Sequence, residues 1–357
     1  MTTEEMAEKL SPWLDGCGQN AESVVSSRVR LARNIAGISF AHRAKPEDLD
    51  QALATLREAL DGAGTLESGD FSLMTDLDDL DREFLVERHL ISHEHAESSP
   101  ARAVAVSKDE TISVMINEED HLRMQSIQSG FDVKNAWKRV DRLDNEVDKR
   151  VEYAFSYEWG YLTACPTNTG TGLRASVLVH LPALVTTGQK DKVLNGIGQM
   201  GLAVRGFYGE GSEVMGNLFQ ISNRTALGSS EIDIVESLHK VVSQVLDFES
   251  RAREILLRDA RSRIEDKVWR AYGILKYCRK AKLQEVMSLT SAVRLGLCLG
   301  MIDSISVAAL NSMVFMSQPA HLQKRAGRRM AAEEREIARA DMVRKILAEE
   351  ESRANAG

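Results

Sequence analysis

Residues 165–181, CPTNTGTGLRASVLVHL, place a turn directly before an apolar run. Proline, asparagine and two glycines lie within the first ten residues, and these residue types bend or interrupt the backbone. SVLVHL at 176–181 is short and rich in β-branched residues, which predicts a β-strand. The stretch therefore predicts a loop that brings a thiol, Cys165, and a guanidinium, Arg174, to the start of a strand.

Further strands and helices are predicted on both sides of this loop. Val133, Trp137, Val140, Leu143 and Val147 recur at steps of four and three, which is typical of one face of a helix. Short apolar runs bounded by polar turns predict three more strands: ARAVAVS at 101–107, TISVMIN at 111–117 and NLFQIS at 217–222.

The pattern changes at Ser230, after which an amphipathic helical period continues to the end without a strand candidate. We therefore expect an α+β fold in two domains. The predicted division is an N-terminal segment over 1–20, an α+β domain over 21–255 and an all-helical domain over 256–357.

The charge is distributed unevenly along the chain. From residue 251 onward there are 21 basic and 13 acidic residues, whereas the first 250 residues hold 24 and 40. An acidic first part argues against nucleic acid as the main partner. The basic second part is typical of solvated helix faces, with an anionic partner as the alternative.

The chain also carries signals that bear on its compartment. The first ten residues, MTTEEMAEKL, lack the apolar core of a signal peptide, and the longest apolar run is too short to cross a bilayer. The four cysteines are widely spaced and form no CxxC pair, which argues against a zinc site and favours a reducing compartment. We expect a cytoplasmic protein without membrane contact.

Five arginines lie beside turns, glycines or carboxylates. A single arginine is most often a solvated surface charge. Several in such settings, however, suggest a clamp for a polyphosphate, because the guanidinium fork matches phosphate geometry and stays charged. These arginines are Arg28, Arg30, Arg123, Arg174 and Arg205.

Four ordered motifs resemble those of phosphagen (ATP:guanidino) kinases. The CPTN and GEGSEVMGN forms are similar to the bacterial protein-arginine kinase branch, the McsB type. Only 25 residues precede Ser26, where small-molecule phosphagen kinases carry a substantial helical domain, and a helical domain follows the α+β domain, as in that branch. The motifs are SSRVRLARN (26–34), NEEDHLR (117–123), CPTNTGTGLRAS (165–176), and RGFYGEGSE (205–213) with QISNR (220–224).

The resemblance implies an antiparallel sheet flanked by helices, a reaction with ATP and Mg²⁺, and three catalytic residues: Glu119, Glu210 and Cys165. It places nucleotide contacts on Ser26, Ser27, Arg28, Val29, Arg30, His89, Arg123, Arg174, Ala175, Ser176, Val177, Leu178, Arg205, Gly206, Phe207, Tyr208, Gly209 and Glu210. Thr169 departs from the family, which usually has an aliphatic residue there.

These roles suit the chemistry of a guanidinium acceptor, which is cationic and a poor nucleophile. Two carboxylates can orient the planar group, and one can take the proton that leaves as the N–P bond forms. A thiolate beside them would complete an anionic acceptor site, while Arg174 belongs to the cationic donor site. Phosphoryl transfer depends mainly on such positioning and charge stabilisation.

Plainer interpretations exist for each motif. Cys165 alone could be a buried structural cysteine, and the four-residue step from Glu119 to Arg123 is also that of a helical ion pair. The histidines of HLISHEHA (89–96) could suggest a metal site, but no second cluster supplies further ligands, so we expect no protein-bound metal.

Near the C-terminus, REIARA resembles a motif, R-D-x-x-R-A, that binds phosphoarginine away from the active site in the protein-arginine kinases. The matching residues are Arg335, Glu336, Arg339 and Ala340, with Glu336 in place of aspartate.

The sequence thus predicts a protein-arginine kinase, with a kinase for small guanidino compounds or a catalytically dead phosphoarginine-binding adaptor as alternatives. The resemblance implies arginine-bearing protein substrates, a role in protein quality control and the stress response, and a homodimer. It also implies three partners: a zinc-binding activator protein, a heat-shock repressor and a Clp-type protease.

Overall fold

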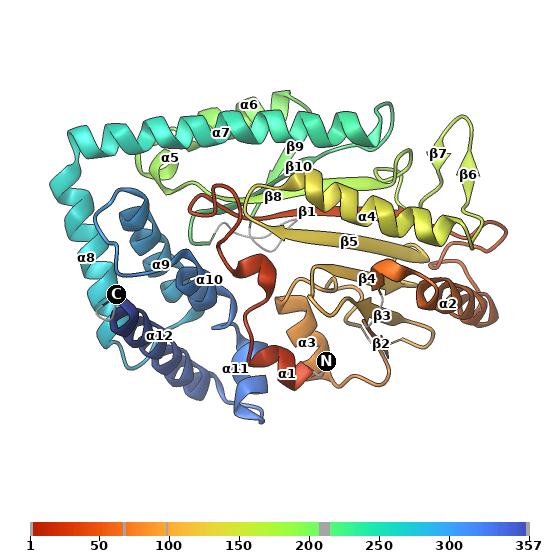
Figure 1. The fold of residues 1–357 in the computed structure, drawn as a ribbon, viewed down its shortest axis with the longest axis horizontal. Coiled ribbons are helices and arrows are strands. Elements are labelled where there is room, and N and C mark those ends of the chain that lie inside the picture. The colour runs from red at the N-terminus through yellow and green to blue at the C-terminus, as the bar shows by residue number, and fades with distance from the viewer. Residues whose placement is uncertain (1–2, 67–68, 98, 207–214, 355–357) are drawn as a thin grey trace.

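The computed structural model describes residues 3–66, 69–97, 99–206 and 215–354, and an eight-stranded sheet lies at its centre (Figure 1). All neighbouring strands are antiparallel, in the order β2-β3-β4-β5-β1-β8-β10-β9. The strands are β1 (Val24–Arg33), β2 (Asp70–Leu73), β3 (Ala103–Val106), β4 (Ile112–Ile116), β5 (Leu122–Ser129), β8 (Leu173–His180), β9 (Leu202–Arg205) and β10 (Leu218–Asn223), with a separate hairpin of β6 (Phe155–Ser156) and β7 (Gly160–Tyr161). The predicted strands are confirmed.

Helices flank the sheet and form the C-terminal part of the described chain. The first group is α1 (Thr3–Ala7), α2 (Pro46–Asp61), α3 (Asp79–Glu87), α4 (Val133–Asp148), α5 (Pro182–Thr186) and α6 (Lys190–Gln199), with 3₁₀ turns η1 (Pro12–Leu14) and η2 (Gly64–Leu66). The second group is α7 (Glu231–Asp259), α8 (Arg261–Tyr277), α9 (Leu283–Cys298), α10 (Val307–Phe315), α11 (Pro319–Ala326) and α12 (Ala332–Ala354).

One face of the sheet carries the main hydrophobic core. Helices α4 and α7 cover this face, and the inward residues of β1 and β8 pack against them. The helical stripe predicted over residues 133–147 supplies the facing side, with Val133, Val140, Leu143 and Val147 all fully buried. The opposite face carries two smaller hydrophobic clusters, one with Val104 and Met115 and one with Ile127 and Leu178, so only the part of it between them is left for polar side chains.

The expected change at Ser230 is the start of the long helix α7. The Ser230 hydroxyl accepts a hydrogen bond from the amide of Asp233, and the Asp233 carboxylate accepts one from the amide of Ser230, which is a capping box. The helix runs through residue 255, the expected domain boundary, and ends at Asp259. In the described residues beyond Asn223 all regular elements are helical.

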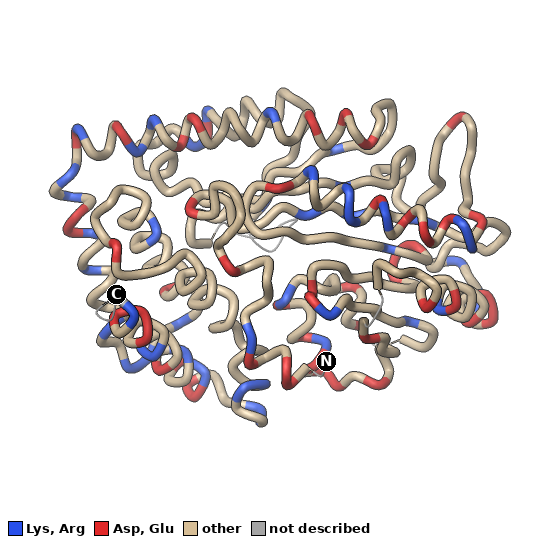
Figure 2. Tube along the Cα trace, viewed as in Figure 1, with Lys and Arg blue, Asp and Glu red and all other residues tan. Residues whose placement is uncertain are grey.

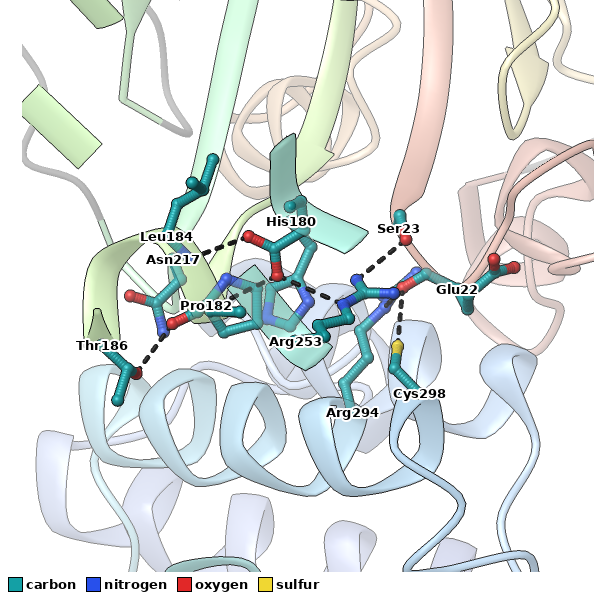
Figure 3. Close-up of polar contacts among 12 residues, drawn as sticks. Glu22, Ser23, His180, Pro182, Leu184, Thr186, Asn217, Arg253, Arg294 and Cys298 are labelled. Carbon is teal, nitrogen blue, oxygen red and sulfur yellow. Dashed lines mark hydrogen bonds and ion pairs between the residues drawn. The ribbon is translucent and has the colours of Figure 1, made fainter. Parts of the chain in front are cut away.

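A buried polar network joins the C-terminal helices to the sheet (Figure 3). Glu249 on α7 accepts hydrogen bonds from the amides of Ala183 and Leu184 at 2.9 and 3.0 Å, which caps the start of α5. Arg253 donates to the Ser23 hydroxyl at 2.9 Å, directly before β1. Arg294 on α9 donates to the backbone carbonyls of Ala21 and Glu22 and to the Asn311 side chain. Helices α7 and α9 are thus tied to the chain that enters β1.

Charged residues of both signs alternate along α7, α8 and α12 (Figure 2). Several form exposed pairs one turn apart, such as Arg270 with Asp266 at 2.8 Å. The basic excess of the second part of the chain is therefore spread over solvated helix faces. Within the described residues, every helix is too short or too polar to span a membrane.

Candidate functional site

The strand register gathers the five predicted arginines on one face of the sheet. Arg30 lies directly opposite Arg174 of β8, and Arg28 is two residues away on the same side. Arg123 of β5 lies opposite Ala32, which shares the side of Arg30. Arg205 of β9 lies opposite Gln220 of β10. Gln220 pairs with Leu178 of β8 and, through it, with Ser26, which is two residues before Arg28 and shares its face. The arginines therefore face the side away from α4 and α7.

The pleat divides the predicted contact ranges 26–30 and 174–178 between two faces. Val29, Ala175 and Val177 point into the core and are fully buried. Ser27 donates to the carbonyl of Gly130 and accepts from the amide of Asp132, so it holds the start of α4. Among these ranges, alternate residues are therefore available to a ligand on the arginine face.

A cavity of about 590 Å³ lies over the arginine face, a size typical of ligand pockets. It brings together Arg28, Arg30, His89, Glu119, Arg123, Cys165, Arg174 and Arg205, all of which the sequence predicts. A second cavity of about 20 Å³, room for roughly one water molecule, adjoins it and is lined by Ser26, Ser176 and Leu178 together with Trp13. Phe207, Tyr208, Gly209 and Glu210 lie outside the described residues.

The arginines form an electropositive cluster whose members repel one another. Burial, together with Arg123 and Arg174, lowers the pKa of Arg28 to about 10. Burial, followed by the charges of Arg28, Arg123 and Arg174, lowers the pKa of Arg30 as well. The buried Nε atoms of Arg28 and Arg30 have no hydrogen-bond partner. Such a cluster is stabilised by a ligand with several negative charges, and a triphosphate has that character.

Two adjacent glutamates on the turn between β4 and β5 have different environments. Glu118 is buried and forms an ion pair with Arg123 at 2.6 Å. Burial opposes its ionisation, but Arg123 and a hydrogen bond from Ser92 lower its pKa to about 2. Glu119 is exposed to the cavity, and partial burial with the nearby Asp120 and Glu118 raises its pKa. Glu118 therefore holds an arginine in place, while Glu119 can accept a proton.

The helical alternative for Glu119 and Arg123 is wrong. Residues 117–121 form the turn between two antiparallel strands, β4 and β5, and Arg123 lies on β5. A turn brings Glu118, rather than the residue four positions before Arg123, next to the guanidinium.

Hydrogen bonds hold the loop that carries Cys165. The Asp120 carboxylate accepts from the amide of Ala164 at 2.7 Å, so the loop is tied to the residue after Glu119. The Thr163 hydroxyl donates to the Cys165 carbonyl at 2.8 Å and lies 3.0 Å from the hydroxyl of Thr169. Thr169, the departure from the family pattern, therefore has a polar partner inside the loop. The Cys165 Sγ lies 3.1 Å from the Thr167 hydroxyl, which can donate to a thiolate.

His89 lies at the junction of the cavity with the N-terminal segment and the C-terminal helices. Its ring contacts Trp13 edge-on at 5.7 Å and Phe315 of α10 at 5.8 Å. Burial and the nearby Arg28 lower its pKa to about 3, so the imidazole is neutral at ordinary pH. A neutral ring can make hydrogen bonds or stack on a base without adding to the positive charge.

The histidines that follow His89 separate in space. His93 lines the cavity with Glu94, whereas His95 is buried and lies 3.0 Å from the Ala103 carbonyl. Among the described residues, no three histidine, cysteine, aspartate or glutamate side chains are grouped so that they could hold a metal ion.

Sequence reasoning missed several residues of the cavity wall. Gln125 lies opposite Arg30, and Gln220 lies opposite Arg205, so both face the cavity. Asn168, of the quoted CPTN, also lines it. Alternate residues of a strand share a face, so Gln125 could have been predicted from its position two residues after Arg123. Gln220 could be placed in the cavity wall only from the register of β10 with its neighbours.

Two family models match separate, consecutive parts of the chain. The family model described as ATP:guanido phosphotransferase, C-terminal catalytic domain, matches residues 51–252. The model described as protein-arginine kinase McsB C-terminal domain matches residues 261–357.

Full-length relatives and solved structures agree with these matches. A protein-arginine kinase of Symbiobacterium thermophilum is 45% identical over 94% of this chain and 96% of its own. One of Geobacillus stearothermophilus is 45% identical over 98% and 96%. The duplicated taurocyamine kinase of Schistosoma mansoni, with bound transition-state analogue components, has a TM-score of 0.61 at 29% identity, over 68% of this chain and 35% of that one. A lombricine kinase has a TM-score of 0.59 at 27% identity, over 68% and 70%.

Both family models therefore match the family that the sequence motifs resemble. The chain belongs to the ATP:guanido phosphotransferase family, in the branch of the bacterial protein-arginine kinases.

Proposed function

We propose that the protein is an ATP-dependent protein-arginine kinase, which transfers the γ-phosphoryl group of ATP to arginine side chains of proteins and forms phosphoarginine. The observation that carries this proposal is a single cavity that joins a cationic strand face to an acid and a thiol. Five arginines lie on the sheet face, and Glu119 and Cys165 on neighbouring loops supply the acid and the thiol. The relatives named protein-arginine kinase support the same activity.

In this proposal the arginine face binds the phosphates of ATP. The guanidinium groups would offset the charge that develops on the transferred phosphoryl group and hold it for in-line attack. Mg²⁺ would be bound through the phosphate oxygens and water, because the described cavity has no cluster of carboxylates for it. The ion would neutralise further charge on the phosphates.

The acceptor arginine would lie on the other side of the cavity. Glu119, together with Glu210, would orient its guanidinium by paired hydrogen bonds. Glu119 would take the proton as nitrogen attacks phosphorus, a role that its raised pKa favours. The Cys165 sulfur, with Thr167 beside it, would complete the anionic side of the site.

Two alternatives have less support. A kinase for small guanidino compounds would need no C-terminal domain of the type that matches residues 261–357. A dead adaptor would not need the arginine face, Glu119 and Cys165 to line one cavity. The activator, repressor and protease partners belong to this proposal as family properties.

A regulatory phosphoarginine site is also part of the proposal. Arg335 on α12 is partly exposed, and its Nη1 donates to the Met330 carbonyl at 2.8 Å. Arg339 is buried, and it donates to the carbonyls of Ser317 at 2.8 Å and Ala281 at 3.0 Å. Arg339 therefore holds helices α9, α11 and α12 together, and a phosphate at this site would act directly on their junction.

Incubation with ATP tests the activity itself. An unfolded protein acceptor should acquire acid-labile phosphate on arginine, whereas free arginine should acquire little. The same acceptor with its arginines converted to citrulline is the control, because it keeps the chain but removes the basic guanidinium. Equal labelling of free arginine would support the small-molecule alternative, and no labelling would contradict the proposal.

The carboxylates are tested by Glu119→Gln and Glu210→Gln. Each variant should lower kcat by about 10²–10⁴-fold with nearly unchanged ATP affinity, since the proposed contact is with the acceptor. Because the pKa of Glu119 is raised, activity of the wild type should fall, as pH decreases, at a higher pH than an ordinary glutamate would set. Wild-type rates in both variants would show that the assignment is wrong.

Cys165 is tested by alkylation in a Cys17→Ser background, which removes an exposed competitor. Cys165 should react faster than Cys278 and Cys298, because burial raises the pKa of both of those thiols. ATP with acceptor should protect Cys165, and mass spectrometry of the peptides gives the rates. Cys165→Ser should lose much but not all activity. Alkylation no faster than at Cys278 would contradict a reactive role.

If phosphoarginine binds at Arg335 and Arg339, free phosphoarginine should alter kinase activity without competing with ATP. Arg335→Ala should weaken the response about tenfold or more, the effect of losing one charge-assisted contact of about 1.5–3 kcal/mol. Arg339→Ala should also lower the melting temperature, since Arg339 bridges two carbonyls. Arg353→Ala, exposed on the same helix, is the control. The same titration curve in Arg335→Ala and Arg353→Ala would refute the site.

A further inference from the structure

A short hairpin beside the catalytic loop has an unusual concentration of aromatic residues. The sequence YAFSYEWGY (153–161) has an aromatic residue at every second position: Tyr153, Phe155, Tyr157, Trp159 and Tyr161. The whole chain has only nine phenylalanines, four tryptophans and six tyrosines, so this density is not a property of its composition. We call residues 153–161 the aromatic hairpin; its paired strands are β6 and β7, which project from the body in Figure 1.

The exposure of these side chains increases toward the tip of the hairpin. Tyr153 is buried, Phe155 is 53% exposed, Trp159 is 48% exposed and Tyr157 is fully exposed. Edge-on contacts connect Tyr153 to Tyr161 at 6.0 Å, Tyr161 to Phe155 at 5.3 Å and Phe155 to Tyr157 at 5.8 Å. An exposed group of large aromatic side chains is costly in water and marks an interaction surface.

The base of the hairpin is firmly held. The guanidinium of Arg33 lies over the ring of Tyr161, 3.6 Å from its centre, and forms an ion pair with Asp144 at 2.6 Å. At the tip, the Ser156 hydroxyl accepts from the amides of Glu158 and Trp159, which fixes the turn. The aromatic tip is thus presented on an ordered support, and such pre-organisation favours binding.

The hairpin is continuous with the acceptor side of the catalytic cavity. Tyr161 and Gly170 exchange backbone hydrogen bonds at 2.8 and 3.3 Å, so β7 is paired with the end of the loop that carries Cys165. The amide of Leu162 donates to the carbonyl of Ala154 at 2.9 Å. Two residues further along the chain, Ala164 is held by Asp120, the neighbour of Glu119. The surface therefore adjoins the part of the site where the acceptor arginine would enter.

From these observations we propose that the aromatic hairpin is a docking surface for the acceptor polypeptide, which binds an extended segment with apolar side chains next to the target arginine. The inference rests on the proposed function, because it assumes a protein acceptor. The exposed Glu152 and Glu158 complement the positive charge of an arginine-bearing segment. Unfolded chains expose such apolar side chains, whereas folded proteins bury them.

The test compares two fluorescein-labelled peptides of equal length and charge, each with one arginine. Leucine and phenylalanine flank the arginine in the first, and serine and glycine in the second. The double variant Tyr157→Ser/Trp159→Ser removes the tip, and Phe248→Ser, which removes a 44% exposed aromatic side chain on α7, is the matched control. Exposed positions tolerate such changes, and a melting curve checks that each variant is folded.

Fluorescence anisotropy without ATP should show that the double variant binds the apolar-flanked peptide about tenfold more weakly. Its affinity for the second peptide and the affinities of Phe248→Ser should be unchanged. With ATP, KM for the apolar-flanked peptide should rise by a similar factor at constant kcat. Equal affinity of wild type and double variant for the apolar-flanked peptide would overturn the proposal, as would a loss confined to self-association of the chain in sedimentation.

The two readouts separate this inference from the proposed function. If the peptides bind in a hairpin-dependent way but acquire no acid-labile phosphate with ATP, the docking surface stands and the kinase proposal fails. If arginine is phosphorylated equally well in both peptides by wild type and double variant, the kinase proposal stands and the docking surface is refuted.

Discussion

Mutual repulsion among the arginines on one face of the sheet is the constraint around which the site is built. Arg30 and Arg174 lie directly opposite each other on neighbouring strands, an arrangement that destabilises a sheet when the charges are alike. The core of α4 and α7 on the other face holds these strands in register despite that cost. Glu118 offsets part of the charge through Arg123. What remains is a preorganised electropositive surface, so a polyphosphate gains from charges that the fold has already brought together.

Much of this arrangement could be predicted from the sequence. Arg28 and Arg30 are two residues apart in a run with strand character, so their common face followed from the pleat alone. The residues that lie opposite them on other strands could not be predicted, because the register between strands that are distant in the sequence depends on the whole sheet. Gln220 is therefore visible as a cavity residue only once β10 is paired with β8 and β9. The helical interpretation of Glu119 and Arg123 was wrong for a related reason. Residues four apart are neighbours on a helix, but here a turn between two strands separates them.

The aromatic hairpin shows another limit of sequence patterns. Alternating aromatic residues are usual in strands with one buried face, and the period gives no sign of whether a sheet or a helix covers that face. Here β6 and β7 have two residues each, so the alternation extends past the paired region into a turn. Arg33 belongs to the motif SSRVRLARN, but its guanidinium stacks on Tyr161 of the hairpin and does not face the cavity. One motif thus supplies both arginines of the cavity and the support of the hairpin.

The C-terminal helices contact the cavity through a short chain of side chains. Glu87 at the end of α3 accepts hydrogen bonds from the amides of Ala320 and His321, which caps α11. The next residue, Arg88, is bound to Glu110 at 2.8 Å, and the one after it is His89 in the cavity wall.

Arg339 holds the carbonyl of Ser317 just before α11. A ligand that competes for Arg339 would therefore remove one of the two contacts at the start of α11, while Glu87 still caps that end. Because Arg88 and then His89 follow the end of α3, a shift of α11 would reach the cavity wall through Glu87. The C-terminal helices are thus joined to the cavity wall by contiguous contacts, the kind of connection through which two sites can be coupled.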